Sequence, residues 1–76
     1  MIKRGQIYRD CDGWMFCTTF VSPAHIAMIY KNGCVKTSTY RRFKNDVEKS
    51  RTTFVAEYKT WQEAVNSKEF NNVAED

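Results

Sequence analysis

The dipeptide Asn32-Gly33 constrains the fold of this chain more than any other feature of the sequence. It separates two runs of apolar and β-branched residues, 26–31 and 34–39. Asn-Gly tolerates the positive φ angles of a tight hairpin turn, and flanking runs of this kind are typical of strands. The sequence therefore predicts an antiparallel hairpin with Asn32-Gly33 at its tip.

A second turn signal, Asp12-Gly13, predicts another hairpin with a two-residue loop. It lies between a short strand over 6–9 and a longer strand over 14–21. Alternation along the longer strand puts Trp14, Phe16 and Phe20 on one face and Met15, Cys17 and Val21 on the other. Because both faces carry apolar side chains, this strand is expected to be covered on both sides.

The second half of the chain mixes helical and strand patterns. Tyr40, Phe43 and Val47 recur at helical spacing, which predicts a short helix over 39–48. Residues 52–58 are β-branched and aromatic and form the expected fifth strand, with side chains alternating in the order Phe54, Ala56 and Tyr58.

Thr60 and Glu63 have the spacing of a capping box, which predicts the start of a terminal helix. The apolar stripe of this helix is Trp61, Ala64 and Val65. Phe70 falls on its other side, so the helix is expected to bend or restart near Ser67.

These elements predict an α+β, mainly β fold in a single domain, 1–76. We expect a small five-stranded antiparallel SH3-like barrel, or a strongly curled sheet, over residues 5–58. A closed barrel removes the exposed edges that a small open sheet would leave, and a C-terminal helix over 60–73 would close one open end of it. The alternative is an open sheet with the terminal helix lying across one face.

The three cysteines, Cys11, Cys17 and Cys34, are an odd number, which favours free thiols in a reducing cytoplasm over a disulfide framework. Their spacing relative to His25, the only histidine, contains no close ligand pair of the kind that structural zinc sites use. We therefore expect neither a metal nor a cofactor.

Catalytic patterns are weak as well. A Cys–His dyad using His25 would have no orienting third group, and the three glycines stand singly at 5, 13 and 33, so no phosphate-binding loop is predicted. We expect a protein that is not an enzyme and has no catalytic residues.

The net charge of +3 conceals an asymmetry along the chain. Residues 1–54 carry a net charge of +6, whereas residues 55–76 carry −3. The cations concentrate in the segment 36–51, and a basic face of this kind is suited to an acidic partner. The candidate interaction surface combines this segment with nearby tyrosines: Tyr30, Lys36, Tyr40, Arg41, Arg42, Lys44, Lys49 and Arg51.

The opening 3–10, followed by Asp12-Gly13, resembles small SH3-like proteins of enterobacterial prophages whose function is not established. Val21, Tyr30 and the Arg41-Arg42-Phe43 stretch fall where the pattern of that family has a valine-rich strand, a tyrosine-bearing strand and a basic segment. The resemblance covers residues 3–47 and implies a phage or prophage origin.

The same opening also resembles the first strand of ribonuclease toxins with this barrel type. In this chain Gln6 stands where that family has an acidic residue, and the chain is shorter than those toxins. A shared fold does not carry an active site with it, so this resemblance does not change the expectation of a protein without catalytic activity.

We therefore expect a small binding module that acts on a host protein as an inhibitor or modulator in the host cytoplasm. The acidic tail, with Glu69, Glu75 and Asp76, offers a further contact to a nucleic-acid-binding host protein. The alternative is a nucleic-acid-binding protein in which the basic segment contacts phosphates and Tyr30 or Tyr40 stacks on unpaired bases. No apolar run approaches the ~18 residues of a membrane span. The sequence does not specify an oligomeric state.

Overall fold

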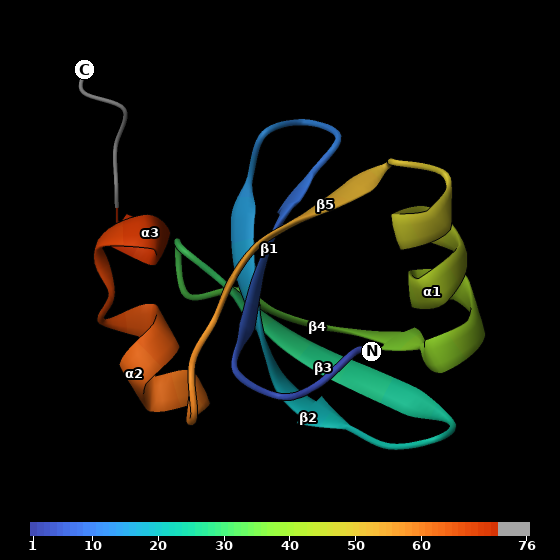
Figure 1. Cartoon of the computed structure of the whole chain (residues 1–76), viewed down its shortest axis with the longest axis horizontal. Coiled ribbons are helices and arrows are strands. Elements are labelled where there is room, and N and C mark those ends of the chain that lie inside the picture. Colours follow the sequence, from blue (N-terminus) through green and yellow to red (C-terminus); the bar gives the residue numbers. More distant parts are fainter. Residues whose placement is uncertain (72–76) are drawn as a thin grey trace.

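Five antiparallel strands form one twisted sheet in the order β4-β3-β2-β1-β5 in the computed structural model, which describes residues 1–71 (Figure 1). The strands are β1 (Gln6–Asp10), β2 (Met15–Val21), β3 (His25–Tyr30), β4 (Val35–Thr39) and β5 (Thr52–Glu57). Strands β4 and β5 are the two edges, and within residues 1–71 they do not pair with each other. The mainly β, five-stranded antiparallel architecture is confirmed. The sheet is not closed within residues 1–71, so the predicted SH3-like barrel is not confirmed.

The hairpin of β3 and β4 forms as predicted, and its loop has three residues, 31–33. The Tyr30 amide donates to the Cys34 carbonyl at 2.7 Å, and Gly33 alone in the loop has a positive φ, of 91°. The β1–β2 loop is built in the same way, with Gly13 at φ 88°. The prediction of a two-residue loop there is wrong, because the third loop position takes the left-handed conformation and needs glycine.

A β-bulge in β2 changes which side chains share a face. The register of β2 against β3 shifts between Thr18 and Phe20, so Phe20 lies opposite Ala27. Consequently Phe16 and Val21 pack in the same cluster, while Phe20 points to the other face and is 53% exposed. The predicted grouping of Phe16 with Phe20 is wrong, because one extra residue reverses the alternation.

A second irregularity, between β1 and β5, has the same effect. Tyr8 lies opposite Phe54, whereas the preceding residue, Ile7, lies opposite Ala56. The ring of Phe54 therefore meets Tyr8 edge-on at 5.7 Å, and Ala56 and Tyr58 pack on the opposite face. The expected simple alternation of Phe54, Ala56 and Tyr58 does not hold.

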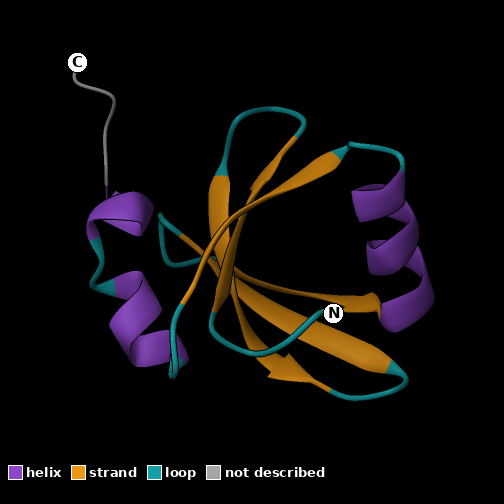
Figure 2. Ribbon diagram, in the orientation of Figure 1, coloured by secondary structure: helices purple, strands orange, loops and turns teal. Residues whose placement is uncertain are grey.

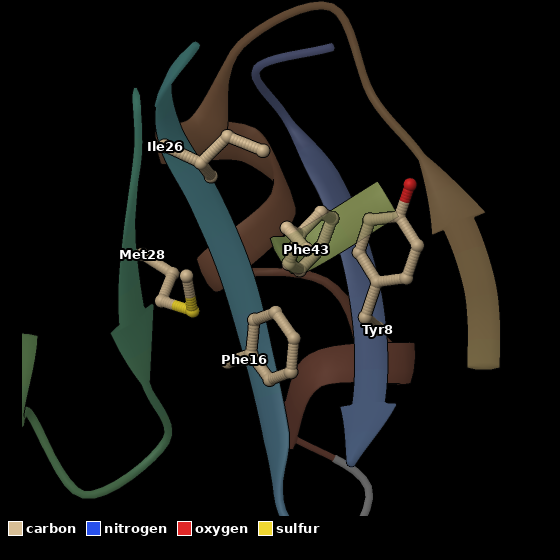
Figure 3. Packing of buried hydrophobic residues seen from close by; sticks show 5 residues of the cluster. All are labelled: Tyr8, Phe16, Ile26, Met28 and Phe43. Carbon is tan, nitrogen blue, oxygen red and sulfur yellow. The ribbon is translucent and has the colours of Figure 1, made fainter. Parts of the chain in front are cut away.

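Short helices cover both faces of the sheet. Helix α1 (Tyr40–Glu48) packs on one face, and α2 (Trp61–Val65) and α3 (Lys68–Asn71) pack on the other (Figure 2). Two separate clusters result. The first consists of Tyr8, Phe16, Ile26, Met28 and Phe43 (Figure 3). The second consists of Ile7, Cys17, Ala64 and Phe70. The terminal helices lie across a face of the sheet, as in the open-sheet alternative.

The terminal helical segment restarts at Ser67, as the sequence predicts. The hydroxyl of Thr60 accepts from the Glu63 amide at 3.1 Å and begins α2. The Ser67 hydroxyl donates to the Ala64 carbonyl at 2.6 Å and accepts from the Phe70 amide at 3.2 Å, so one side chain ends α2 and begins α3. The restart turns Phe70 into the second cluster. The predicted end of the helix, 72–73, lies outside the described residues.

Gly5 joins the N-terminal segment to β2 and to the residue that follows β5. Its amide donates to the Thr18 carbonyl at 2.8 Å, and its carbonyl accepts from the Tyr58 amide at 2.9 Å. Its φ is 85°, and a Cβ at this position would lie 2.5 Å from the Tyr58 carbonyl oxygen. Both the backbone conformation and the close approach therefore require glycine here.

Replacement of Gly5 by alanine is expected to lower the free energy of unfolding by about 3 kcal/mol or more, because a steric clash adds to the left-handed strain. Gly33→Ala is the matched control: it has a similar φ and open space around the position of a Cβ. It should cost only about 1–2 kcal/mol. Urea unfolding of the two variants measures the difference, and equal losses would contradict the close-approach argument.

The three thiols differ in accessibility. Cys17 is buried in the second cluster, whereas Cys11 and Cys34 are exposed. Burial raises the pKa of the Cys17 thiol to about 11, because the thiolate would lose its hydration.

Thiol labelling of the folded protein near pH 8 should modify Cys11 and Cys34 rapidly and Cys17 at least about a hundredfold more slowly, since little thiolate forms at the buried position. In denaturant all three should react at similar rates without prior reduction. Cys17→Ala serves as the control and should remove only the slow phase. Three equal rates in the folded state would contradict the burial of Cys17.

Candidate interaction surface

Helix α1 positions most of the candidate residues. Strand β4 runs directly into it, and the Thr39 hydroxyl caps its first turn by accepting from the Arg42 amide at 3.2 Å. Phe43 is the buried residue of the helix. Because Phe43 points into the sheet, its neighbours Arg42 and Lys44 are exposed.

The predicted cations lie on β4, on α1 and in the segment that joins α1 to β5. Lys36 is on β4, Lys49 follows the last turn of α1, and Arg51 precedes β5. We call the following set the basic surface; every member is exposed: Lys36, Arg41, Arg42, Lys44, Lys49 and Arg51. In Figure 1 α2 and α3 lie at the opposite end of the molecule from α1. Of the predicted acidic tail, Glu69 is in α3, and Glu75 and Asp76 lie outside the described residues.

Most of this charge is uncompensated. Arg51 pairs with Asp46, with its Nη2 2.9 Å and its Nε 3.0 Å from Oδ1. Within residues 1–71 the other five cations of the basic surface form no ion pair within 4 Å. Exposed cations without a partner keep their hydration and remain available to an acidic ligand.

The two predicted tyrosines are half-buried and line different depressions, Tyr30 between β3 and α1 and Tyr40 at the start of α1. The Tyr30 ring centroid lies 5.0 Å from that of Phe16, and the Lys36 ammonium lies 4.9 Å from the Tyr30 centroid. Burial, followed by the charge of the Asp10 carboxylate, raises the pKa of Tyr30. Tyr40 packs against the first cluster. Both rings already have packing partners, which reduces the area left for stacking on a base.

A groove of about 680 Å³ lies between α1, the β3–β4 hairpin and the ends of β1 and β5. We call it the main groove. Its apolar lining comes from the first cluster and consists of Phe16, Met28 and Phe43, and its cations are Lys36, Arg42 and Arg51. Half-buried Tyr30 also lines it. The structure thus brings four of the eight predicted residues together in one groove.

The remaining predicted residues lie elsewhere around α1. Tyr40 and Lys44 line a second cleft, of about 510 Å³, together with Phe54. Arg41 shares a third hollow of about 520 Å³ with Arg42 and Lys44, so the basic surface continues around the outside of the helix. Lys49 lines none of these three depressions.

Sequence reasoning missed the polar residues that complete the main groove. They include the carboxylates of Asp10 and Asp46, the exposed His25 and a hydroxyl-bearing stretch over 37–39. One signal was present in the sequence: β4 reads Val-Lys-Thr-Ser-Thr, which is unusually polar for a strand and is typical of an exposed edge.

Within residues 1–71 no group of three or more His, Cys, Asp or Glu side chains is arranged to hold a metal ion. In that same part of the chain no helix has the length and apolar character needed to cross a membrane. Comparison with known proteins found no matching family model, no matching curated protein and no matching solved structure.

Truncation of Phe43 to alanine should lower the free energy of unfolding by about 3–5 kcal/mol, because it removes the buried side chain that holds α1 on the sheet. Arg41→Ala, two positions earlier on the same helix and exposed, is the control and should change it by less than about 0.5 kcal/mol. Thermal unfolding measures both. A small loss for Phe43→Ala would mean that α1 is held by other contacts.

Proposed function

We propose that this protein is a non-enzymatic binding module that attaches to an acidic surface of a protein partner through the basic surface. The observation that carries the proposal is the presence of five exposed cations on β4, α1 and the segment that follows α1, none of which forms an ion pair within residues 1–71. Uncompensated charge of one sign steers an oppositely charged partner and selects against a partner of the same charge.

A protein partner is favoured over a nucleic acid by the composition of the main groove. Its floor is apolar and is formed by Phe16, Met28 and Phe43, a surface that phosphates cannot use. Tyr30 is engaged by Phe16 and Lys36, so it is a poor stacking platform for a base. An acidic protein surface with apolar side chains suits the groove better.

Nucleic-acid binding is the second candidate, because the same five cations could contact phosphates. Arg41, Arg42 and Lys44 surround a hollow on the outer side of α1 that contains a single carboxylate, from Glu48. This outer hollow, rather than the main groove, would be the contact site for a phosphate backbone.

The biological setting is also part of the proposal. A phage or prophage accessory protein that modulates a host protein in the cytoplasm would agree with the resemblance of residues 3–47. The SH3-like relationship is supported by a four-strand meander whose fifth strand returns beside the first. The proposed origin and the SH3-like relationship do not depend on which class of partner binds.

The test compares two charge-reversed variants with equal net charge. The first carries Arg41→Glu, Arg42→Glu and Lys44→Glu on the basic surface. Each protein is immobilised and exposed to bacterial lysate, with and without nuclease, and the captured proteins are quantified. The unmodified chain should retain a stoichiometric partner after nuclease, and the first variant should retain at least about tenfold less.

The matched control reverses three exposed cations outside the basic surface: Arg4→Glu, Lys59→Glu and Lys68→Glu. It should capture the partner as the unmodified chain does. In parallel, binding of an oligothymidylate is titrated with salt. Nucleic-acid binding would replace the protein proposal if the oligonucleotide bound with a log-linear loss of affinity in salt and no nuclease-resistant protein were captured.

A further inference from the structure

Within residues 1–71, strand β4 leaves one of its edges unpaired. It pairs with β3 alone in this part of the chain. The Tyr30 amide donates to the Cys34 carbonyl, so this pair is a hydrogen-bonded one, and such pairs alternate along an antiparallel ladder. Val35 and Thr37 fall at the intervening positions, so their amide and carbonyl groups point away from β3. The outer edge therefore offers a row of free backbone donors and acceptors.

The main groove lies beside this edge. Lys36 and Ser38 lie opposite Met28 and Ile26 in the register, so they share the face that carries α1 and the first cluster. A strand added outside β4 would continue this alternation and point every second side chain into the groove. Those side chains would meet the apolar floor and the cations at its rim.

The charge available in the groove selects the occupant. Lys36 and Arg42 line the groove and have no ion-pair partner among the described residues. The two groove carboxylates, Asp10 and Asp46, keep their charge, and the three cations Lys36, Arg42 and Arg51 outnumber them by one. Asp46 pairs with Arg51, and Asp10 accepts from two backbone amides of the β1–β2 loop, at 3.0 and 2.9 Å. The remaining charge is positive and complements an acidic segment.

We propose that β4 is the docking strand for an extended segment of the partner in which acidic and apolar side chains occupy alternate positions. The segment adds to the free edge as a sixth strand. Its backbone pairs with Val35 and Thr37, and its acidic and apolar side chains enter the main groove. The inference rests on the proposed function and specifies how the partner is recognised: main-chain hydrogen bonds provide general affinity, and the groove provides selectivity.

The first test uses two synthetic peptides of identical composition, TETLTET and TTEELTT. Only the first keeps Glu, Leu and Glu on one face of a strand. Amide hydrogen exchange by NMR is measured with each peptide in excess. With TETLTET, exchange at Val35 and Thr37 should slow by at least about tenfold, because their amides gain hydrogen bonds. The Lys36 amide, which faces β3, is the internal control and should not change.

The second test removes one outward amide. Thr37→Pro deletes the N–H that would bond to the added strand, and proline is tolerated at edge positions that do not donate within the sheet. Thr37→Ala keeps the amide and is the matched control. Fluorescence anisotropy should show that TETLTET binding is lost in the proline variant and kept in the alanine variant. Thermal unfolding checks that both variants fold. If the proline variant does not fold, the hydrogen-exchange measurement on the unmodified chain decides whether the peptide adds to β4.

Three results would overturn strand addition. The two peptides could bind equally without protecting Val35 and Thr37, which would leave charge recognition by the basic surface intact. The second such result is that neither peptide binds to the protein. Finally, the two amides could already be protected in a dimer of the free protein, which would make a second copy the occupant. The proposed function fails separately, if charge reversal on α1 leaves capture of the lysate partner unchanged.

Discussion

The contact between Phe43 and Tyr8 fixes helix α1 on the sheet, and the geometry of the basic surface depends on it. The two rings meet edge-on, with centroids 5.0 Å apart, and Phe43 lies 5.9 Å from Phe16 in a similar arrangement. Phe43 is the buried residue of a nine-residue helix. Helices of this length have little stability of their own, so tertiary packing at this side chain holds α1 in place. The same packing sets how far α1 stands from β4 and therefore how wide the main groove is.

Local signals predicted the elements of this fold well, and pairing between distant strands limited the rest. Gly13 and Gly33 mark both hairpins because a left-handed loop position is a property of a few adjacent residues. The bulges near Phe20 and Phe54 are different, because each depends on the strand it pairs with. A single unpaired residue reverses all later side chains, so alternation read along one strand assigns these two aromatic residues to the wrong groups.

The candidate site was predictable in its charge and not in its shape. A count of cations along 36–51 is enough to identify a basic segment, and exposure of all six agrees with the polarity of β4, of α1 and of the segment between α1 and β5. To predict the main groove, one would need to know that Phe16 and Met28 form part of its floor. These residues come from strands that are distant from α1 in the sequence. The pairing of Arg51 with Asp46 likewise removes one cation from the available charge, a correction that residue types alone do not provide.

An exposed edge strand also carries a risk of aggregation, and the composition of β4 addresses it. The strand has five residues, and its central part is Lys36, Thr37 and Ser38. A charged lysine on a short polar edge makes continuous stacking of copies costly, since each added chain would bury an ammonium group beside another edge. This cost falls when the incoming strand carries carboxylates. The charge of Lys36 is therefore expected to act in two ways at this edge, because it opposes the stacking of identical copies and favours an incoming strand that carries carboxylates.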